Sequence, residues 1–373
     1  MLPQIEIQLI AVLSAAACVI PGVFLVLRRM AMMSDSITHT ILLGIVLGFF
    51  LTNDLSSPLL ILGAGIVGVA TVWLTESFTR TRLLSEDSSI GIVFPFLFSI
   101  AIVLISRYAG SVHLDTDSVL LGELAFAPFN RLRVCGADIG AKAIYTSGAL
   151  LLLNLAVIVI FFKEFQLSAF DSALAASLGF SPVLLHYGLT AMVSFTTVGS
   201  FEAVGSVLVV AFMIGLPTAA YLLTDNLKRM ILLSILFSAI AGVAGFQIAL
   251  WLDVSIAGCM AGVVGLLFVL AFFFSPKRGL LHNLIKRSRQ KFEFTVSALL
   301  FHLFFSEQQS SEPYLGESLE HACLHLKWSG KHLSRIVKRL KKNGLLTEED
   351  GLLTLTDKGR VKVRKARAEL FCR

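Results

Sequence analysis

Two ionisable residues, Asp35 and His39, stand four positions apart in an otherwise apolar stretch, residues 32–44 (MMSDSITHTILLG). On a helix they would share one face, because residues i and i+4 are neighbours on a helical surface. Ionisable side chains at membrane depth are costly and usually face a cavity or a partner. A carboxylate and an imidazole are also ligands for divalent transition metals. The pair predicts a metal path; the alternative is that both side chains are satisfied by helix–helix hydrogen bonds.

The depth of His39 supports the first interpretation, since about nine residues at 1.5 Å each place it roughly 13 Å into its run. A permeation site must release its ion, so two protein ligands completed by water or further carboxylates suit it. Glu202, in the sequence GSFEAVG between two apolar runs, is a further candidate metal ligand or a solvated loop carboxylate. His113, Asp115 and Asp117 form a polar cluster for which a metal site and an exposed loop both stay open.

The composition indicates what surrounds these residues. The chain has 373 residues, of which 56% are hydrophobic and only 15% charged, and its mean hydropathy is +0.82. Soluble proteins usually carry about 25% charged residues. The composition therefore predicts a polytopic membrane protein. The five scattered cysteines show no CxxC spacing, which argues against a zinc ribbon or a disulfide framework.

Apolar runs near or above the spanning length of about 18 residues recur along the chain. They fall at residues 7–27, 31–52, 57–78, 88–106, 143–162, 182–200, 203–223, 229–250 and 254–274. Basic residues at alternate ends, such as Arg28 and Lys163, assign one side to the cytoplasm by the positive-inside rule. The predicted fold class is an all-α polytopic membrane protein with about nine transmembrane helices. It would lie in a bacterial plasma (inner) membrane with its C-terminus in the cytoplasm, and a short re-entrant helix is expected at 118–126.

The sequence contains no GxxxxGK[ST], HExxH or GxSxG motif. The chain therefore shows no P-loop nucleotide site and no hydrolase signature of its own. These absences disfavour an enzyme and favour a transport subunit.

A short segment between two runs, residues 164–181 (EFQLSAFDSALAASLGFS), lies on the predicted cytoplasmic side. Ser168 or Asp171 can cap a short helix there, and Gly179 would end it. Its apolar residues would be Ala173, Leu174, Ala176 and Leu178. Such a helix rests on the membrane or docks into a groove of a soluble partner.

Several stretches, in order within residues 7–275, resemble the permease subunit of ABC-type manganese, zinc and iron transporters, the ABC-3 metal permease family. They are RRMAMMSDSITHTILLG, SEDSSIGIVFPFLFSIAIVLIS, DTDSVLLGEL, FDSALAASLGFSP and VGSFEAVGSVLVVAFMIGLPTAAYLLT. The chain departs from the family at Leu43, before Gly44, where proline is frequent.

The resemblance implies a homodimeric or heterodimeric permease that takes Mn, Zn or Fe(II) from an extracytoplasmic metal-binding protein. A separate cytoplasmic ABC ATPase would drive it, and no permanently bound cofactor is implied. The residues so implied are Asp35 and His39 for the metal, and Asp171, Ala175, Leu178 and Gly179 for the helix that docks on the ATPase.

The C-terminal part of the chain differs in charge. Residues 277–373 hold 20 Lys and Arg against 10 Asp and Glu, a net of +10, whereas the preceding residues carry a net of −4. We therefore expect a transmembrane permease domain at 1–275 and a basic juxtamembrane linker at 276–291, attracted to anionic lipids. A cytoplasmic domain would follow at 292–373.

The pattern of residues 292–373 predicts a small winged helix-turn-helix domain. Helices are expected at 292–306, 315–326 and 330–343, followed by a hairpin that turns at Asp350-Gly351 and a basic last helix. The order resembles that of metal- or antibiotic-responsive winged-helix repressors. Possible DNA contacts from the third helix are Lys331, His332, Ser334, Arg335, Lys338 and Arg339. The alternative is a regulatory or interaction module that does not bind DNA.

Two other functions remain open at this stage. A permease for an iron chelate or cobalamin would need a wide cavity and no Asp/His pair at the midplane. A membrane-anchored metal-responsive transcription regulator would need no ATPase partner.

Overall fold

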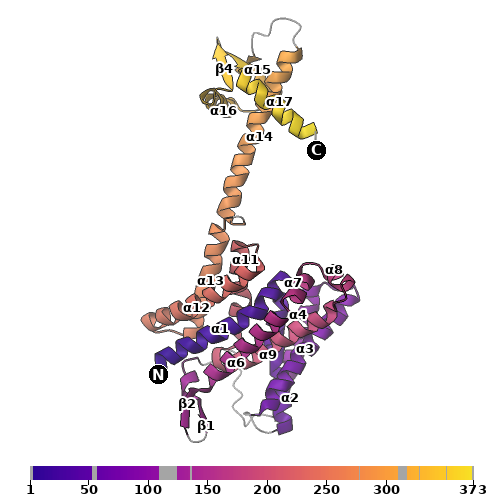
Figure 1. Ribbon diagram of the computed structural model, residues 1–373, viewed down its shortest axis with the longest axis vertical. Coiled ribbons are helices and arrows are strands. Elements are labelled where there is room, and N and C mark those ends of the chain that lie inside the picture. Colours follow the sequence, from indigo (N-terminus) through magenta and orange to yellow (C-terminus); the bar gives the residue numbers. More distant parts are fainter. Residues whose placement is uncertain are drawn as a thin grey trace. The chain divides into compact units, whose positions relative to one another are not determined.

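The structure is a computed structural model that describes residues 3–52, 57–108, 124–134, 137–276, 278–309, 317–326, 328–349 and 351–371. The chain divides into two compact units, Met1–Leu280 and Leu281–Arg373, which we call the membrane unit and the C-terminal unit (Figure 1). The polar cluster His113, Asp115 and Asp117, and most of the re-entrant helix expected at 118–126, lie outside the described residues.

Helices fill the membrane unit. They are α1 (Pro3–Leu27), α2 (Ala31–Thr52), α3 (Pro58–Arg80), α4 (Glu86–Tyr108), α6 (Lys142–Ile160), α9 (Pro182–Val204), α10 (Ser206–Val210), the π-helix η2 (Ala211–Gly215), α11 (Leu216–Leu223), α12 (Leu227–Leu252) and α13 (Ile256–Phe274). Eight helical segments in the described parts, with α10–η2–α11 counted as one, are long and apolar enough to cross a membrane. Eight of the roughly nine expected membrane spans are therefore confirmed. The other expected span corresponds to α9, which buries polar residues such as Thr196 and Ser200.

Helix α1 forms the centre of this unit, with α6, α9, α12 and η2 packed around it (Figure 1). Buried polar contacts fix these neighbours. The Asn154 amide nitrogen donates to the Ala17 carbonyl oxygen (3.0 Å) and to the Thr196 hydroxyl (2.7 Å), joining α6, α1 and α9. Small polar side chains of this kind hold helices together in lipid, where the hydrophobic effect does not drive helices together.

Glycines bring the backbones of α2 and α3 into contact. A Cβ atom at Gly44 would lie 2.5 Å from the Gly63 carbonyl oxygen and 2.7 Å from the Ala64 nitrogen. One at Gly48 would lie 3.0 Å from the Leu60 Cα. Only glycine permits so close an approach, and this positions α2 against α3 along the length that follows His39.

The segment α10–η2–α11 contains a widened helical turn close to Pro217. Pro217 cannot donate a backbone hydrogen bond and its ring crowds the carbonyl four residues earlier. The π-helical turn Ala211–Gly215 stands immediately before Pro217 and relieves this conflict. The proline thus changes the helix locally, from α-helical to π-helical geometry in the turn before it.

A small β-hairpin was not expected from the sequence. Strands β1 (Arg131–Val134) and β2 (Ala137–Ala141) pair antiparallel after the short 3-10 helix η1 (Ala127–Phe129). An Arg131 guanidinium nitrogen lies 3.4 Å from a carboxylate oxygen of Glu6, whose residue is only 2% exposed. This ion pair fastens the hairpin to the first turn of α1.

The short helix expected near residue 171 is confirmed. Helix α7 (Phe162–Phe170) is followed by α8 (Ser172–Ser177), and the Asp171 carboxylate accepts the Leu174 amide at 2.9 Å as the N-cap. Gly179, just beyond α8, has a φ of +89°, a conformation that suits glycine.

The C-terminal unit contains α14 (Leu280–Gln309), β3 (Glu317–Ser318), α15 (Leu319–Leu326), α16 (Gly330–Lys342), β4 (Leu346–Glu349), β5 (Leu352–Leu355) and α17 (Asp357–Phe371). The strands form an antiparallel sheet in the order β3-β5-β4. Leu333, Ile336 and Leu340 of α16 are buried in its core, as their spacing predicts. From Leu280 onward the expected linker is helical and continues without a break into the expected first helix of this unit.

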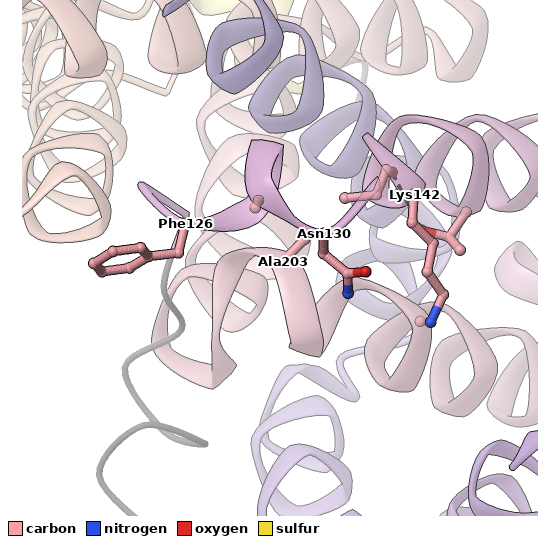
Figure 2. A pocket seen from close by; sticks show the side chains of 8 residues that line it. Phe126, Asn130, Lys142 and Ala203 are labelled. Carbon is pink, nitrogen blue, oxygen red and sulfur yellow. Dashed lines mark hydrogen bonds between the residues drawn. The ribbon is translucent and has the colours of Figure 1, made fainter. Parts of the chain in front are cut away.

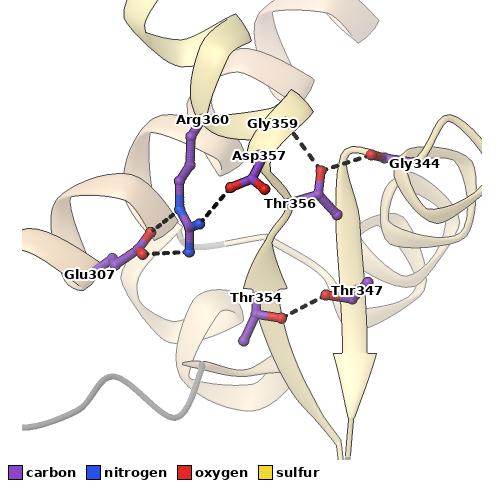
Figure 3. A network of polar contacts seen from close by, with 8 residues as sticks. All are labelled: Glu307, Gly344, Thr347, Thr354, Thr356, Asp357, Gly359 and Arg360. Atoms are coloured by element: carbon purple, nitrogen blue, oxygen red, sulfur yellow. Dashed lines mark hydrogen bonds and ion pairs between the residues drawn. The ribbon is translucent and has the colours of Figure 1, made fainter.

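A polar network closes this unit (Figure 3). The Arg360 guanidinium grips both oxygens of Glu307 at 3.2 and 2.7 Å, which joins α17 to α14. The Thr356 hydroxyl donates to the Gly344 carbonyl oxygen at 2.7 Å and ties the start of α17 to the end of α16.

Candidate metal site

Helix α2 places Asp35 and His39 side by side, as their spacing predicts. The Asp35 Oδ1 and His39 Nε2 atoms lie 3.6 Å apart, and the two side chains are 45% and 27% exposed within a single chain. The buried face of the helix carries Ser34 and Thr38, whose hydroxyl donates to the Ser34 carbonyl oxygen at 2.7 Å. The pair therefore lies on an accessible face of α2, beside buried polar residues.

Two phenylalanines of α4 hold the imidazole. The His39 ring centroid lies 5.2 Å from that of Phe94 and 6.0 Å from that of Phe98, the latter edge-on. These ring contacts restrict the rotation of the imidazole, whose Nε2 atom lies near Asp35.

The residues next to the pair anchor α2. The Ser34 hydroxyl donates to the Met213 sulfur at 3.0 Å, and Met213 belongs to the π-helical turn η2. The Thr71 hydroxyl of α3 donates to that of Thr40 at 2.9 Å. The pair is thus positioned by a helix held on one side by α3 and on another by η2.

Asp35 and His39 supply two of the four ligands that a tetrahedral site needs. Across the described residues, no group of three or more His, Cys, Asp or Glu side chains is arranged to hold a metal ion. Glu202 belongs to the last turns of α9, which ends at Gly205, so the expectation of a loop at this position is wrong. Its side chain lies outside the described part of the chain.

A second polar cluster, which the sequence reasoning missed, lies at the end of the bundle that holds Arg28. The Glu76 carboxylate of α3 contacts the His186 imidazole, accepts the Tyr187 hydroxyl at 2.8 Å and lies 3.5 Å from Arg80. The signal available was Glu76 itself, an acidic residue in an apolar run. Its partners on α9 are more than 100 positions away and are brought to it only by the fold.

This cluster borders a cavity of about 620 Å³. Arg28, Arg80, Arg82 and a second carboxylate, Glu86, also line the cavity, so charges of both signs face it. The Arg28 guanidinium donates to the Ser168 hydroxyl of α7 at 2.8 Å. The contacts around the cavity therefore connect α3, α9 and the α7–α8 segment.

Another cavity, of about 170 Å³, lies between η1, α6 and α9 (Figure 2). Figure 2 shows the Asn130 amide and the Lys142 side chain at this cavity, beside Phe126 and Ala203. An amide and an ammonium group do not provide the carboxylate or imidazole ligands of a transition metal.

The residues predicted to contact the ATPase and DNA differ in how exposed they are. In α8, Ala175 is fully buried, whereas Leu174 and Leu178 are 45% and 60% exposed. In α16, Arg335, Lys338 and Arg339 are exposed and Ser334 is half-buried. The Arg339 guanidinium packs over the Phe292 ring at 4.6 Å, and the side chains of Lys331 and His332 lie outside the described part.

Comparisons with known proteins agree with this architecture. The ABC 3 transport family matches residues 5–275. The zinc transport system membrane protein TroD of Treponema pallidum is 41% identical over 365 residues, which cover 98% of this chain and 99% of TroD. The manganese transport system membrane protein MntD of Bacillus subtilis is 44% identical over 270 residues, which cover 72% of this chain and 91% of MntD.

A solved structure shares the fold. The structure of PsaBC from Streptococcus pneumoniae in complex with Fab contains a chain with 27% identity and a TM-score of 0.61, over 73% of this chain and 91% of that one. With a family match that extends over most of its length, this multi-pass membrane protein belongs to the ABC 3 transport family.

Proposed function

We propose that this chain is the membrane permease subunit of an ABC importer that moves Mn, Zn or Fe(II) into the cytoplasm. The observation that carries the proposal is the contact of Asp35 with His39 on the accessible face of α2. Two ligands bind a divalent ion weakly enough to release it, as transport requires. Further ligands come from a second permease subunit or from water. The names of the zinc and manganese transport relatives support this substrate class.

The proposed orientation in the membrane rests on the distribution of basic residues. We propose that the end of the bundle with Arg28 faces the cytoplasm, together with Arg80, Lys163 and Lys228. The N-terminus and the β1–β2 hairpin then lie outside, where an extracytoplasmic metal-binding protein delivers the ion. The C-terminal unit lies in the cytoplasm.

ATP hydrolysis belongs to a separate ABC ATPase that docks on α8. Exposed Leu174 and Leu178 give this short helix an apolar surface with no other role in the membrane unit. Asp171 and Gly179 fix where the helix starts and stops, while buried Ala175 joins it to the bundle. The half-buried Arg28–Ser168 contact connects α7, next to the docking helix, to the residue that follows α1.

Uptake of radiolabelled Zn²⁺ and Mn²⁺ by cells tests the metal path. We expect Asp35→Ala and His39→Ala each to lower uptake at least about 10-fold at unchanged membrane levels, because one of two ligands is lost. Asp253→Asn is a matched control, since Asp253 is exposed at the end of α12 in a left-handed conformation that asparagine also adopts. Normal uptake by the Asp35 and His39 variants would exclude the proposed path. Loss of cobalamin or chelate uptake instead would favour the bulkier substrate.

We further propose that the C-terminal unit is a winged helix with a regulatory, DNA-binding role. Its element order and the β4–β5 hairpin next to α16 support this fold. The match to TroD extends over nearly the whole chain, so that relative shares this unit. Exposed Arg335 and Lys338 suit contacts to phosphates.

DNA binding by the full chain in lipid nanodiscs tests this role. We expect affinity for duplex DNA to fall steeply with salt, and the double variant Arg335→Glu, Lys338→Glu to abolish it. Lys286→Glu with Arg287→Glu, an equal charge change on exposed residues of α14, is the control. If both double variants bind alike, α16 does not contact DNA and the unit is an interaction module.

A further inference from the structure

Three imidazoles and a carboxylate meet inside the C-terminal unit. They come from three elements: His302 from α14, Glu317 from β3, and His321 and His325 from α15. The His302 Nε2 and His321 Nδ1 atoms each lie 2.7 Å from the Glu317 Oε1 atom. The His325 ring centroid lies 4.5 Å from that of His321 and 5.4 Å from that of His302. We call these four residues the histidine cluster.

Glu317 is the unusual member of the cluster. Its side chain is only 5% exposed, and its Oε2 atom is buried with no hydrogen-bond partner in the described part of the chain. A buried carboxylate with an oxygen that accepts no hydrogen bond is costly unless a cation compensates it.

We propose that the histidine cluster binds one divalent transition-metal ion of the zinc class. Imidazole nitrogens and a carboxylate oxygen are zinc ligands, and three nitrogens with one oxygen complete a tetrahedral set. A mixed nitrogen and oxygen set also binds Zn²⁺ more tightly than Mn²⁺. Glu317 supplies the charge that offsets part of the ion's own.

The geometry requires a small rearrangement. The cluster now hydrogen bonds and stacks instead of surrounding a common point. Ligand atoms around tetrahedral zinc are about 3.3 Å apart, so the His302 and His321 nitrogens must move away from the Glu317 oxygen, and all three imidazole rings must turn toward the ion. The His321 side chain is 58% exposed and His325 is exposed, so an ion can enter from solvent.

Metal binding would link the elements of the histidine cluster to α16, the helix that carries the exposed basic residues. The ion would join α14 and β3 to α15, and α15 packs on α16. Occupancy of the site would therefore fix the position of α16, which carries Arg335 and Lys338. This inference does not depend on the membrane pair, and either can fail without the other.

Titration of the purified full chain with Co²⁺ and then Zn²⁺ tests the site. The chain carries Asp35→Ala and His39→Ala so that the membrane pair contributes no signal. We expect one equivalent of Co²⁺ with the visible absorption of tetrahedral coordination, displaced by one equivalent of Zn²⁺. Glu317→Gln and His321→Ala should each weaken binding at least about 100-fold.

His282→Ala, which removes an exposed histidine from the same helix α14, should leave binding unchanged. Glu317→Gln preserves the shape of the side chain, and an unchanged circular dichroism melting curve without metal shows that it folds. Absence of tetrahedral Co²⁺ absorption would overturn the proposal. Equal affinity in the Glu317→Gln, His321→Ala and parent chains would overturn it too, since the ion would then bind elsewhere.

Discussion

Replacement of Gly44 by alanine tests the backbone contact that positions the metal pair. The added Cβ would lie 2.5 Å from the Gly63 carbonyl oxygen, whereas ordinary Cβ contacts begin near 3.4 Å. Backbone atoms cannot rotate away, so α2 must move from α3 by about 1 Å. Overpacking of this kind costs about 1–3 kcal/mol, and the better helix propensity of alanine returns at most about 1 kcal/mol.

We therefore expect Gly44→Ala to lower the free energy of unfolding in detergent by about 1–2 kcal/mol. Metal uptake should fall as well, because Gly44 and His39 are on the same helix and the shift moves the imidazole relative to Phe94. Gly91→Ala is the matched control, since an added Cβ there meets no described atom within 4 Å. It should be neutral or stabilising by up to about 1 kcal/mol. Equal stability and uptake for the two variants would refute the reasoning.

Other parts of the chain give predictions of different kinds. Leu174→Asp with Leu178→Asp should abolish copurification of the ATPase, whereas Ser172→Asp, at the first position of α8, should not; retained binding would exclude α8 as the docking helix. Ile336→Ala should lower the unfolding free energy of the C-terminal unit by about 2–4 kcal/mol in denaturant titrations, because Ile336 is 1% exposed; an unchanged midpoint would contradict the packing of α16. Arg360→Lys should cost at most about 1 kcal/mol in the same assay, with a smaller difference at high salt, since the ion pair is partly exposed; a loss that is independent of salt would show that the guanidinium acts by packing.

The sequence predicted the membrane unit where a local rule was sufficient. Asp35 and His39 share a face because helical geometry alone determines it, and Asp171 caps α8 because the capping rule is local. Glu202 was misplaced because the apolar runs expected at 182–200 and 203–223 left it between two spans, whereas α9 continues to Val204. In the structure Gly199 is helical and packs against Leu150, and Gly205, with a φ of +77°, ends the helix instead.

What the sequence could not predict depends on contacts between distant residues. The β1–β2 hairpin has little strand propensity in ADIGA and depends on pairing and on the Arg131–Glu6 contact. The basic linker was identified by charge, yet its leucines and lysines are good helix formers and extend α14. In the histidine cluster Glu317, His321 and His325 follow one another at spacings of four residues, whereas His302 joins them through the tertiary fold.

The backbone contact of α2 with α3 also has a mechanical consequence. Where two helices touch backbone to backbone at Gly44 and Gly48, neither can rotate about its own axis without a collision. The two helices are therefore expected to move together as one rigid unit. Helix α2 carries Asp35 and His39, and α3 carries Glu76, which contacts His186 of α9 at the same end of the bundle, where Arg28 lies. A displacement of the metal pair would therefore also displace Glu76 and its contact with α9, and the pivot of any rocking motion would lie outside the helix pair.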